Sequence, residues 1–367
     1  MLDTFINKTT EAIKNATENI KKAVDTLDPP KVFPLNRKSL SRICAAVAVD
    51  AGQTLFNGVF RNIGIAVYQS ASSIDEDPPS LYAFWASPSL PDEDRKQVIC
   101  EQLDRLEEKD TMIREFVKQM GWGTIYQDDV MPDSCFKSAS AFSNFIRDLL
   151  EWSRLVKIGE ELQSFAKDKL GIQPILLRDG TLRFASLGEK QARSLANIFR
   201  NLDTPIFGIT KQSALLRDPV IYSWMDKHKV FATKGPFLVW IEKEMFEELG
   251  WRLERYFGGE GIRFGRYAFV RFDPMPGSRN IFAVDIPDYL LPDGTNPDNL
   301  DNILVLLSGV AQQATATTYP IPGYPLALKK AHDKAVLSEH RVSLLESSFR
   351  RTLPPEVFEL LKGLSLF

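Results

Sequence analysis

Two aspartates follow short apolar runs that have the composition of buried strands. Asp50 follows the run 44–49, Asp179 follows the run 175–178, and a glycine comes within two residues of each. Such a run predicts a strand that ends at the rim of a sheet. Two rims side by side would bring the carboxylates close enough to hold Mg²⁺ or Mn²⁺, which prefer oxygen ligands. Two such ions about 3.5 to 4 Å apart can activate a water and stabilise the leaving oxygen of a phosphodiester. The alternative is that each Asp-Gly pattern only makes a turn.

A third carboxylate is expected, because two alone rarely fix a pair of metal ions. The helix predicted before the Asp179 strand offers Glu151, Glu160 and Glu161. Nine or ten residues of helix separate Glu151 from the other two by roughly 14 to 15 Å, so they cannot serve the same site. Any of these glutamates could equally belong to a solvated helix face.

A tyrosine and a histidine lie far downstream. His332 is one of three histidines, and Tyr324 precedes it by eight residues across a Gly-Tyr-Pro turn that leads into a helix. A histidine beside a metal-binding carboxylate can bind the ion, orient water or move a proton near neutral pH. Tyr324 could hydrogen-bond a phosphate or position that histidine. Taken alone, His332 could also be a core histidine. No HExxH pattern occurs, so the sequence does not support a zinc protease.

Positive charge occurs at two further places. Lys211 follows a predicted strand at 205–209 and could neutralise a phosphate oxygen, or it could be a solvated strand-end lysine. Aromatic residues are interleaved with five arginines, Arg252, Arg255, Arg263, Arg266 and Arg271. Arginines among aromatics suit a nucleic-acid single strand, since they pair with phosphates while the rings stack on bases. The alternative is a sheet with a charged outer face.

Strands that alternate with helices must position these residues, which favours an α/β sheet. We expect strands near 43–50, 59–68, 81–86, 172–179, 205–209, 237–241 and 267–272. We expect helices near 2–27, 91–121, 136–170, 188–201, 299–316, 326–347 and 355–363.

The first predicted helix ends before Asp28-Pro29-Pro30. Ile6, Ile13, Ile20 and Leu27 recur every seven residues along it, as in a coiled-coil seam. It could therefore bind a second copy or a partner, or it could pack on its own domain. We treat 1–30 as this helix and 31–367 as the main domain, with an insertion at about 70–135.

Composition narrows the functional classes. The 367 residues carry 45 Lys and Arg against 48 Asp and Glu, so DNA binding would need a local basic patch. Three cysteines without a CxxC pair argue against a zinc site or a disulfide framework and fit a reducing cytoplasm. No apolar run approaches about 18 residues and no signal-peptide core is present, so we expect neither a membrane span nor export. There is no GxxxxGK[ST] pattern, so any ATP-driven movement would come from a partner.

In this order, the two aspartate strands and the tyrosine-histidine pair resemble the NurA nuclease family. The resemblance spans roughly residues 40 to 345 and implies a ribonuclease H-like mixed sheet flanked by helices, with a helical insertion and an N-terminal helix. It also implies that Glu151 joins Asp50 and Asp179 as a manganese or magnesium ligand, with His332 completing the site. Tyr324 and Lys211 would then position the scissile phosphate.

The same resemblance implies DNA as substrate, a homodimer, and a HerA-type hexameric ATPase as partner in end resection and double-strand break repair. Exonuclease activity is expected, with single-strand endonuclease activity as an addition. The sequence departs from the family at Ala51, in the 28 residues from Glu151 to Asp179, and in the enlarged segment 70–135. Three alternatives stay open: a DNA clamp or adaptor without catalysis for a hexameric ATPase, a nuclease subunit of a phage-defence system, and RNA as substrate.

Overall fold

The computed structural model of this chain describes residues 2–36, 43–56, 64–86, 90–168, 172–182, 189–211, 213, 215–242, 245, 265–275, 277–291, 300–314 and 321–352. Its strands are β1 (Lys31–Pro34), β2 (Ile43–Phe56), β3 (Gly64–Ser72), β4 (Leu81–Ala86), β5 (Ile172–Asp179), β6 (Ile206–Thr210), β7 (Phe237–Trp240), β8 (Gly265–Arg271) and β9 (Phe282–Pro287). Its α-helices are α1 (Leu2–Thr26), α2 (Asp92–Lys109), α3 (Thr111–Met120), α4 (Ser134–Lys137), α5 (Ala139–Asp168), α6 (Glu189–Leu202), α7 (Pro219–Lys227), α9 (Asp301–Gln312), α10 (Leu326–Ala335) and α11 (Glu339–Thr352).

All nine strands form one mixed sheet in the order β1-β7-β8-β9-β6-β5-β2-β3-β4. The strands β2, β5 and β6 run parallel to one another, and the other neighbouring pairs are antiparallel. The five strands from β4 to β6 comprise an antiparallel meander followed by two parallel strands, which is the arrangement of a ribonuclease H-like sheet. The predicted fold class is therefore confirmed.

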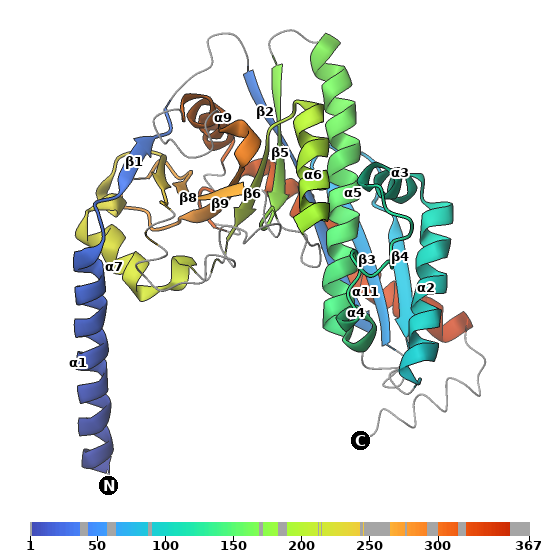
Figure 1. Cartoon of the computed structure of the whole chain (residues 1–367), viewed down its shortest axis with the longest axis horizontal. Coiled ribbons are helices and arrows are strands. Elements are labelled where there is room, and N and C mark those ends of the chain that lie inside the picture. Colours follow the sequence, from blue (N-terminus) through green and yellow to red (C-terminus); the bar gives the residue numbers. More distant parts are fainter. Residues whose placement is uncertain are drawn as a thin grey trace.

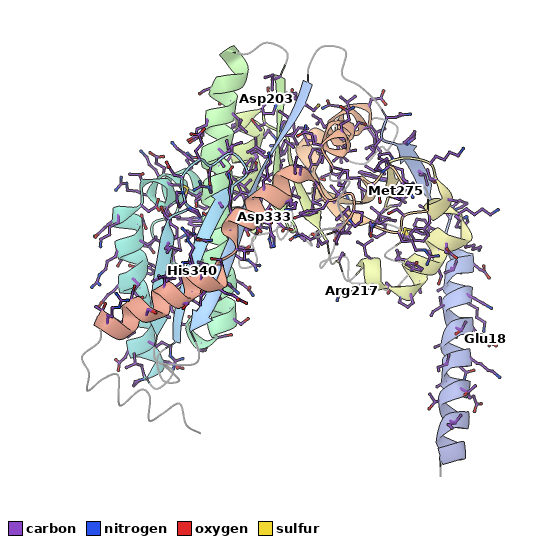
Figure 2. The ribbon with its side chains drawn as sticks, turned by 180° about the vertical axis from the view of Figure 1, so that it is seen from behind. Glu18, Asp203, Arg217, Met275, Asp333 and His340 are labelled. Carbon is purple, nitrogen blue, oxygen red and sulfur yellow. The ribbon has the colours of Figure 1, made fainter. Side chains whose placement is uncertain are left out.

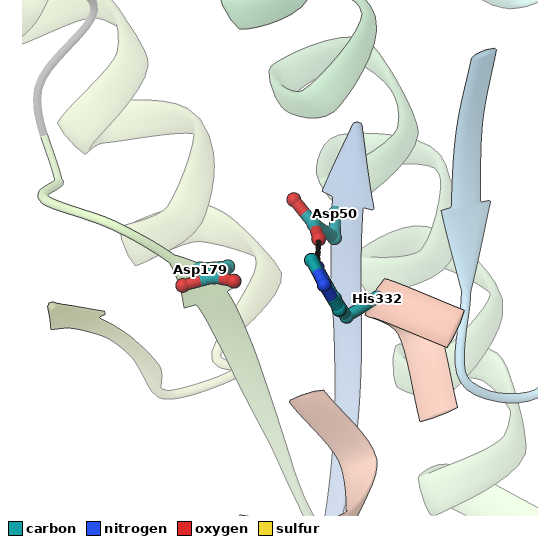
Figure 3. Close-up of side chains that lie close together, drawn as sticks. All are labelled: Asp50, Asp179 and His332. Carbon is teal, nitrogen blue, oxygen red and sulfur yellow. Dashed lines mark hydrogen bonds and ion pairs between the residues drawn. The ribbon is translucent and has the colours of Figure 1, made fainter. Parts of the chain in front are cut away.

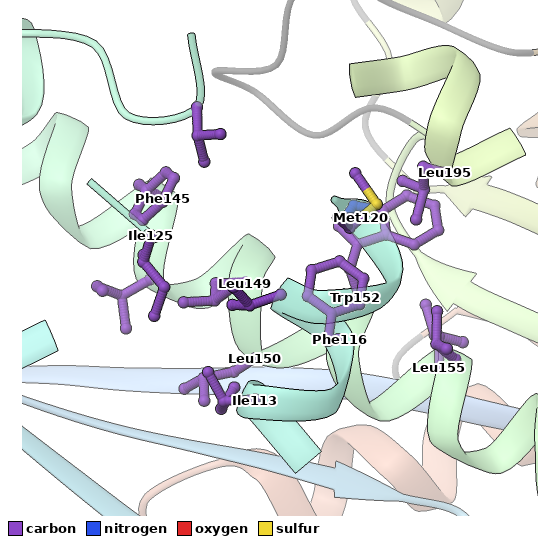
Figure 4. Packing of buried hydrophobic residues seen from close by; sticks show 14 of the residues in the cluster. Ile113, Phe116, Met120, Ile125, Phe145, Leu149, Leu150, Trp152, Leu155 and Leu195 are labelled. Atoms are coloured by element: carbon purple, nitrogen blue, oxygen red, sulfur yellow. The ribbon is translucent and has the colours of Figure 1, made fainter. Parts of the chain in front are cut away.

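Helices cover both faces of the central strands (Figure 1). Side chains alternate along β2, so Val47 and Val49 pack with α5 in one core while Ala48 packs with α9 and α10 in the other. Figure 4 shows the first core, where Trp152 and Phe116 lie among the aliphatic residues of α3 and α5. Burial on both faces explains why β2 and β5 are almost continuously apolar in sequence.

The first helix projects from the body of the molecule (Figure 1). Its last turns are anchored: Val24 and Leu27 pack in a core with Trp224 of α7. Farther toward the N-terminus, Ile6 and Ile13 are 49% and 61% exposed. Figure 2 shows this half of α1 standing clear of the other elements. Within the described part of the chain, none of the helices combines the length and the apolarity needed to cross a membrane.

Several predicted elements differ in extent. The helix expected at 326–347 is two helices, α10 and α11, so His332 and His340 do not share a helix. The helix expected at 91–121 is divided at Asp110, whose carboxylate caps α3 by accepting the backbone N–H groups of Met112 and Ile113. Short elements β9 and α7 were not predicted, because six and nine residues give little periodicity.

Other expectations are tested only in part or not at all. The predicted strand 59–68 corresponds to β3, which begins at Gly64 and extends to Ser72. Residues 57–63 and the helix expected at 355–363 lie outside the described residues. The division into 1–30 and 31–367 with an insertion at 70–135 stays a prediction. Within that insertion, β4 forms an edge of the main sheet.

Candidate metal centre between strands β2 and β5

The two aspartates lie side by side, but not both at strand ends. Asp179 is the last residue of β5, and Gly180 follows it with φ +117°. The prediction that Asp50 also ends its strand is wrong, because β2 continues for six further residues. Parallel pairing with β5 runs up to Val49 opposite Arg178, and from Val49 onward β2 pairs with β3. Asp50 therefore lies where β2 leaves β5, and the gap that opens there faces Asp179.

His332 joins the two aspartates. One ligand atom from each of Asp50, Asp179 and His332 lies within 4.8 Å of the other two. The imidazole Nδ1 is 2.7 Å from Oδ2 of Asp50 (Figure 3). Carboxylate oxygens suit Mg²⁺ and Mn²⁺, and an imidazole nitrogen shifts the preference toward the transition metal. The three side chains therefore fit a manganese ion, with magnesium as a weaker choice.

Close packing of α10 against the sheet fixes the position of His332. A Cβ atom added to Gly52 would lie 1.9 Å from the carbonyl oxygen of Ala335 at the end of α10. The buried amide of Gln69 on β3 donates to the carbonyls of Lys334 and Ala335 at 3.0 and 2.8 Å. A glycine on β2 and a glutamine on β3 thus hold the end of the helix against the sheet, two residues along β2 from Asp50.

Lys211 and Tyr324 both contact Asp179. The Lys211 ammonium lies 2.8 Å from Oδ2 of Asp179, and the Tyr324 hydroxyl donates to the same oxygen at 3.0 Å. Lys211 also lies 4.4 Å from the centre of the Tyr324 ring. Burial and the charge of Asp50 raise the pKa of Asp179, while Lys211 and Tyr324 oppose that rise. Burial and the Asp179 carboxylate raise the pKa of Tyr324, so its hydroxyl keeps its proton and donates.

Glu151 reaches Asp50 from the opposite side of the sheet. Its Oε1 accepts the N–H of Ala51 at 3.2 Å, and Asp50 Oδ1 accepts the same N–H at 2.8 Å. Its Oε2 accepts from Arg178 Nε at 2.8 Å. Glu151 is therefore adjacent to the Asp50, Asp179 and His332 group without being part of it. Burial raises the pKa of Glu151 above its ordinary value, Arg178 opposes the rise, and Asp50 adds to it.

The two rival glutamates lie elsewhere on α5. Glu160 accepts a hydrogen bond of 2.7 Å from Gln119 of α3, and Glu161 is exposed. Of the three candidates on this helix, Glu151 is the one that reaches the aspartates. Its role as a metal ligand stays a prediction.

The arginine cluster is described only in part. Arg252, Arg255 and Arg263 lie outside the described residues. Arg266 pairs with Asp288 at 3.2 Å. Arg271 is fully buried and donates to backbone carbonyls in the segment 231–235 and at Ser278, so its inclusion among surface DNA-binding arginines is wrong. DNA binding by the other four stays a prediction.

Sequence reasoning missed three buried charged residues that support the centre. Arg178 pairs with both Asp148 and Glu151. Asp285 of β9 accepts the N–H of Leu182 at 2.6 Å and so fixes the turn that follows Asp179. Arg178 and Asp285 each interrupt an apolar strand in the sequence, and a charge inside a buried strand indicates a partner.

Comparison with known proteins finds similarity among solved structures alone. No family model matches the sequence, and no curated protein matches it. Among solved structures, it is similar to the NurA nuclease of Sulfolobus solfataricus, with 14% identity, coverage of 95% of this chain and 98% of that one, and a TM-score of 0.38. A NurA bound to dAMP and manganese is 13% identical over 98% of both chains, with a TM-score of 0.38.

Endonuclease V of Ciona intestinalis, solved in complex with DNA, is 12% identical over 89% of this chain and 98% of that one, with a TM-score of 0.28. Proteins this distant can share a fold and differ in activity. NurA nucleases are thus among the solved structures to which this chain is similar, as its motifs predicted.

Proposed function

We propose that this protein is a metal-dependent deoxyribonuclease that hydrolyses phosphodiester bonds with Mn²⁺ or Mg²⁺. The observation that carries the proposal is the convergence of Asp50, Asp179 and His332 from three distant parts of the chain. A protein that only clamps DNA has no use for two carboxylates near phosphates, which they repel. An ion bound by this group would supply Lewis-acid stabilisation of charge on the phosphate and a lower pKa for water.

The surrounding side chains have separate tasks in this proposal. Asp50 and His332 share a hydrogen bond, so the imidazole is oriented toward the centre and can take or give a proton. Tyr324 fixes the rotamer of Asp179, since its hydroxyl donates to Oδ2. Lys211 offsets the negative charge of Asp179 and so reduces the repulsion of an approaching phosphate. Glu151 stays a proposed fourth ligand, because it shares the Ala51 N–H with Asp50.

The wider role follows the family resemblance. We propose exonuclease action, with single-strand endonuclease activity as an addition, in DNA end resection and double-strand break repair in the cytoplasm, alongside a HerA-type translocating ATPase. We also propose a homodimer in which α1 contributes a contact, since Ile6 and Ile13 are exposed at heptad spacing.

Cleavage of end-labelled single- and double-stranded DNA tests the activity. Reactions with Mn²⁺, Mg²⁺ or a chelator compare the native chain with Asp50→Asn and Asp179→Asn. Asp226→Asn is the matched control, because Asp226 is an exposed carboxylate of α7 that pairs with Arg279. We expect metal-dependent cutting that is lost in the two site variants and kept in the control.

The opposite result would favour a different class of protein. A native chain that binds DNA but does not cut it, even with a cognate translocating ATPase and Mn²⁺ present, would identify a clamp or adaptor. Equal cutting of RNA and DNA would shift the substrate assignment while leaving the metal centre in place.

A further inference from the structure

A single buried arginine connects the two strands that carry the aspartates. Arg178 is 4% exposed, and its guanidinium lies 4.8 Å from the Trp152 ring. Its Nε donates to Glu151 at 2.8 Å, and its Nη2 donates to Asp148 at 2.5 Å. Its Nη1 donates to the carbonyl of Thr181. The planar fork of the guanidinium allows all three contacts at once, which a lysine ammonium on a flexible stem cannot reproduce.

These contacts reach both aspartates through the backbone. Glu151, held by Arg178, accepts the N–H of Ala51, the residue after Asp50. Thr181 belongs to the turn that follows Asp179. One side chain therefore ties β2, through Glu151, to the turn at the end of β5, at the point where the two strands stop pairing.

Charge balance makes this connection sensitive to substitution. Arg178 forms ion pairs with both Asp148 and Glu151, and both carboxylates are nearly inaccessible to water. If one partner of a buried ion pair is removed, the charge that remains has lost its compensation. Without Arg178, both carboxylates would lose this ion pair, and Glu151 would no longer be held against Ala51.

We infer that Arg178 is a positioning residue, which sets the spacing of Asp50 and Asp179 for cation binding by way of Glu151 and the turn at Thr181. This inference rests on the proposed metal centre. It assigns to Arg178 no contact with the ion or with DNA, so its effect is on the geometry of the ligands.

Manganese affinity is the direct test. Isothermal titration with Mn²⁺ compares the full-length native chain with Arg178→Gln and Arg178→Lys, each first checked for folding by circular dichroism. Loss of a residue that orients metal ligands weakens binding by about 10- to 100-fold, which we expect for Arg178→Gln. Arg178→Lys keeps the positive charge but lacks the planar guanidinium. Its Mn²⁺ affinity should therefore lie between those of the native chain and Arg178→Gln.

A matched control separates positioning from general destabilisation. Arg271 is also fully buried, but it donates to carbonyls of the segment 231–235. We expect Arg271→Gln to lower the melting temperature and to leave the Mn²⁺ dissociation constant within about twofold of the native value, since altered stability alone does not change ligand geometry.

A second measurement needs no metal. The imidazole signals of His228, His332 and His340 can be followed by NMR in a chelator, and Arg178→Gln should shift the His332 signal alone, because His332 bonds to Asp50. If Arg178→Gln does not fold, Arg178→Lys and Asp148→Asn provide the same two readouts.

Unchanged Mn²⁺ affinity and an unmoved His332 signal in folded variants would overturn the inference while the metal centre stood. If the native chain does not bind Mn²⁺ at all, the proposed function fails together with the inference. If the native chain binds Mn²⁺, and Arg178→Gln binds it more weakly while Arg271→Gln does not, the result supports both the metal centre and the positioning role of Arg178.

Discussion

The two carboxylates of the centre and the adjacent Glu151 each have their own hydrogen-bonding or charged neighbour. Asp50 bonds to His332, Asp179 to Lys211 and Tyr324, and Glu151 to Arg178. Close carboxylates would otherwise repel one another and take up protons. Because these neighbours occupy the same oxygens that a cation would use, a metal must compete with a proton on the imidazole and with the lysine ammonium.

The pH dependence of stability tests the His332 contact. The hydrogen bond to Asp50 raises the pKa of His332 above its ordinary value of 6.5. A raised pKa in the folded state stabilises the fold fully below about pH 6.5, and this contribution is lost as the pH rises through the folded-state pKa. In the presence of a chelator, His332→Gln should therefore lose more unfolding free energy, relative to the native chain, at pH 6 than at pH 9.

Urea unfolding at the two pH values measures the difference, with exposed His340→Gln as control. An equal loss of stability at pH 6 and pH 9 would contradict a charged His332 in the folded protein.

The Tyr324 hydroxyl can be removed without changing the ring. Tyr324→Phe deletes the hydrogen bond to Asp179, which should cost about 0.5 to 1.5 kcal/mol of unfolding free energy. Cleavage should fall as well, since Asp179 loses one of the groups that orient it. Tyr82→Phe is the matched control, because the Tyr82 hydroxyl bonds to Asp110 at 2.6 Å away from the centre.

Both tyrosine variants should be destabilised, and only Tyr324→Phe should lose activity. Full cleavage by folded Tyr324→Phe would leave Tyr324 as a purely structural residue. Chemical unfolding and initial cleavage rates measure the two effects separately.

Individual site residues were predictable where local sequence identifies them. Asp50 and Asp179 follow apolar runs, and Tyr324 and His332 flank a turn that leads into a helix. Arg178 gave only the weaker signal of a charge within a strand, because its partner Asp148 is 30 residues away. Sequence spacing does not specify which helical carboxylate turns toward a strand, which is why Glu160 and Glu161 remained alternatives to Glu151.

At the scale of elements, two helices approach the gap between β2 and β5 from opposite faces of the sheet. Helix α10 brings His332, and α5 brings Glu151. Helix α5 lies within the helix expected at 136–170, so its existence was predictable. The break between α10 and α11 was not predicted, because residues 336–338 are Val-Leu-Ser and contain neither glycine nor proline.

The contact between α10 and β2 gives a prediction at this scale. Gly52→Ala would place a methyl group against the carbonyl of Ala335, so α10 must move away from β2. We expect a loss of about 1 to 3 kcal/mol of unfolding free energy, as for other overpacked contacts. Cleavage should fall too, because His332 moves with the helix.

Gly123→Ala is the control, because the nearest atom to its added Cβ is a flexible side-chain oxygen of Gln127 at 3.4 Å. Melting temperature and cleavage rate measure both effects. Native-like stability in Gly52→Ala would show that α10 tolerates displacement from β2.

At the scale of the whole molecule, the class of fold was predictable but the order of strands was not. Alternating helices and strands indicated an α/β sheet, and β4 was predicted with its observed limits. The pairing of β1 with β7 joins residues more than 200 positions apart, and no local pattern encodes it. Short β9, which links β6 to β8, was missed, so the sheet could not be completed from sequence.

The projecting half of α1 gives a prediction for the assembled protein. Ile6→Glu with Ile13→Glu should weaken self-association at least about tenfold, because it places charges on the exposed heptad positions. The melting temperature of the monomer should not change, since both side chains are exposed.

Asn15→Asp with Lys22→Gln makes the same change of net charge on the opposite helix face, where both side chains are exposed, and should leave association intact. Analytical ultracentrifugation measures the association. An unchanged dimer in the isoleucine variant would remove α1 from the interface.

The order of the site residues along the chain has a consequence for biosynthesis. Asp50 comes first, Asp179 follows 129 residues later, and His332 follows after a further 153 residues. A ribosome must therefore translate both carboxylates well before the imidazole that joins them. Incomplete chains therefore hold two aspartates without their nitrogen partner, and a truncated product released early cannot assemble the centre. The proposed nuclease activity is thereby confined to molecules that have been translated past His332.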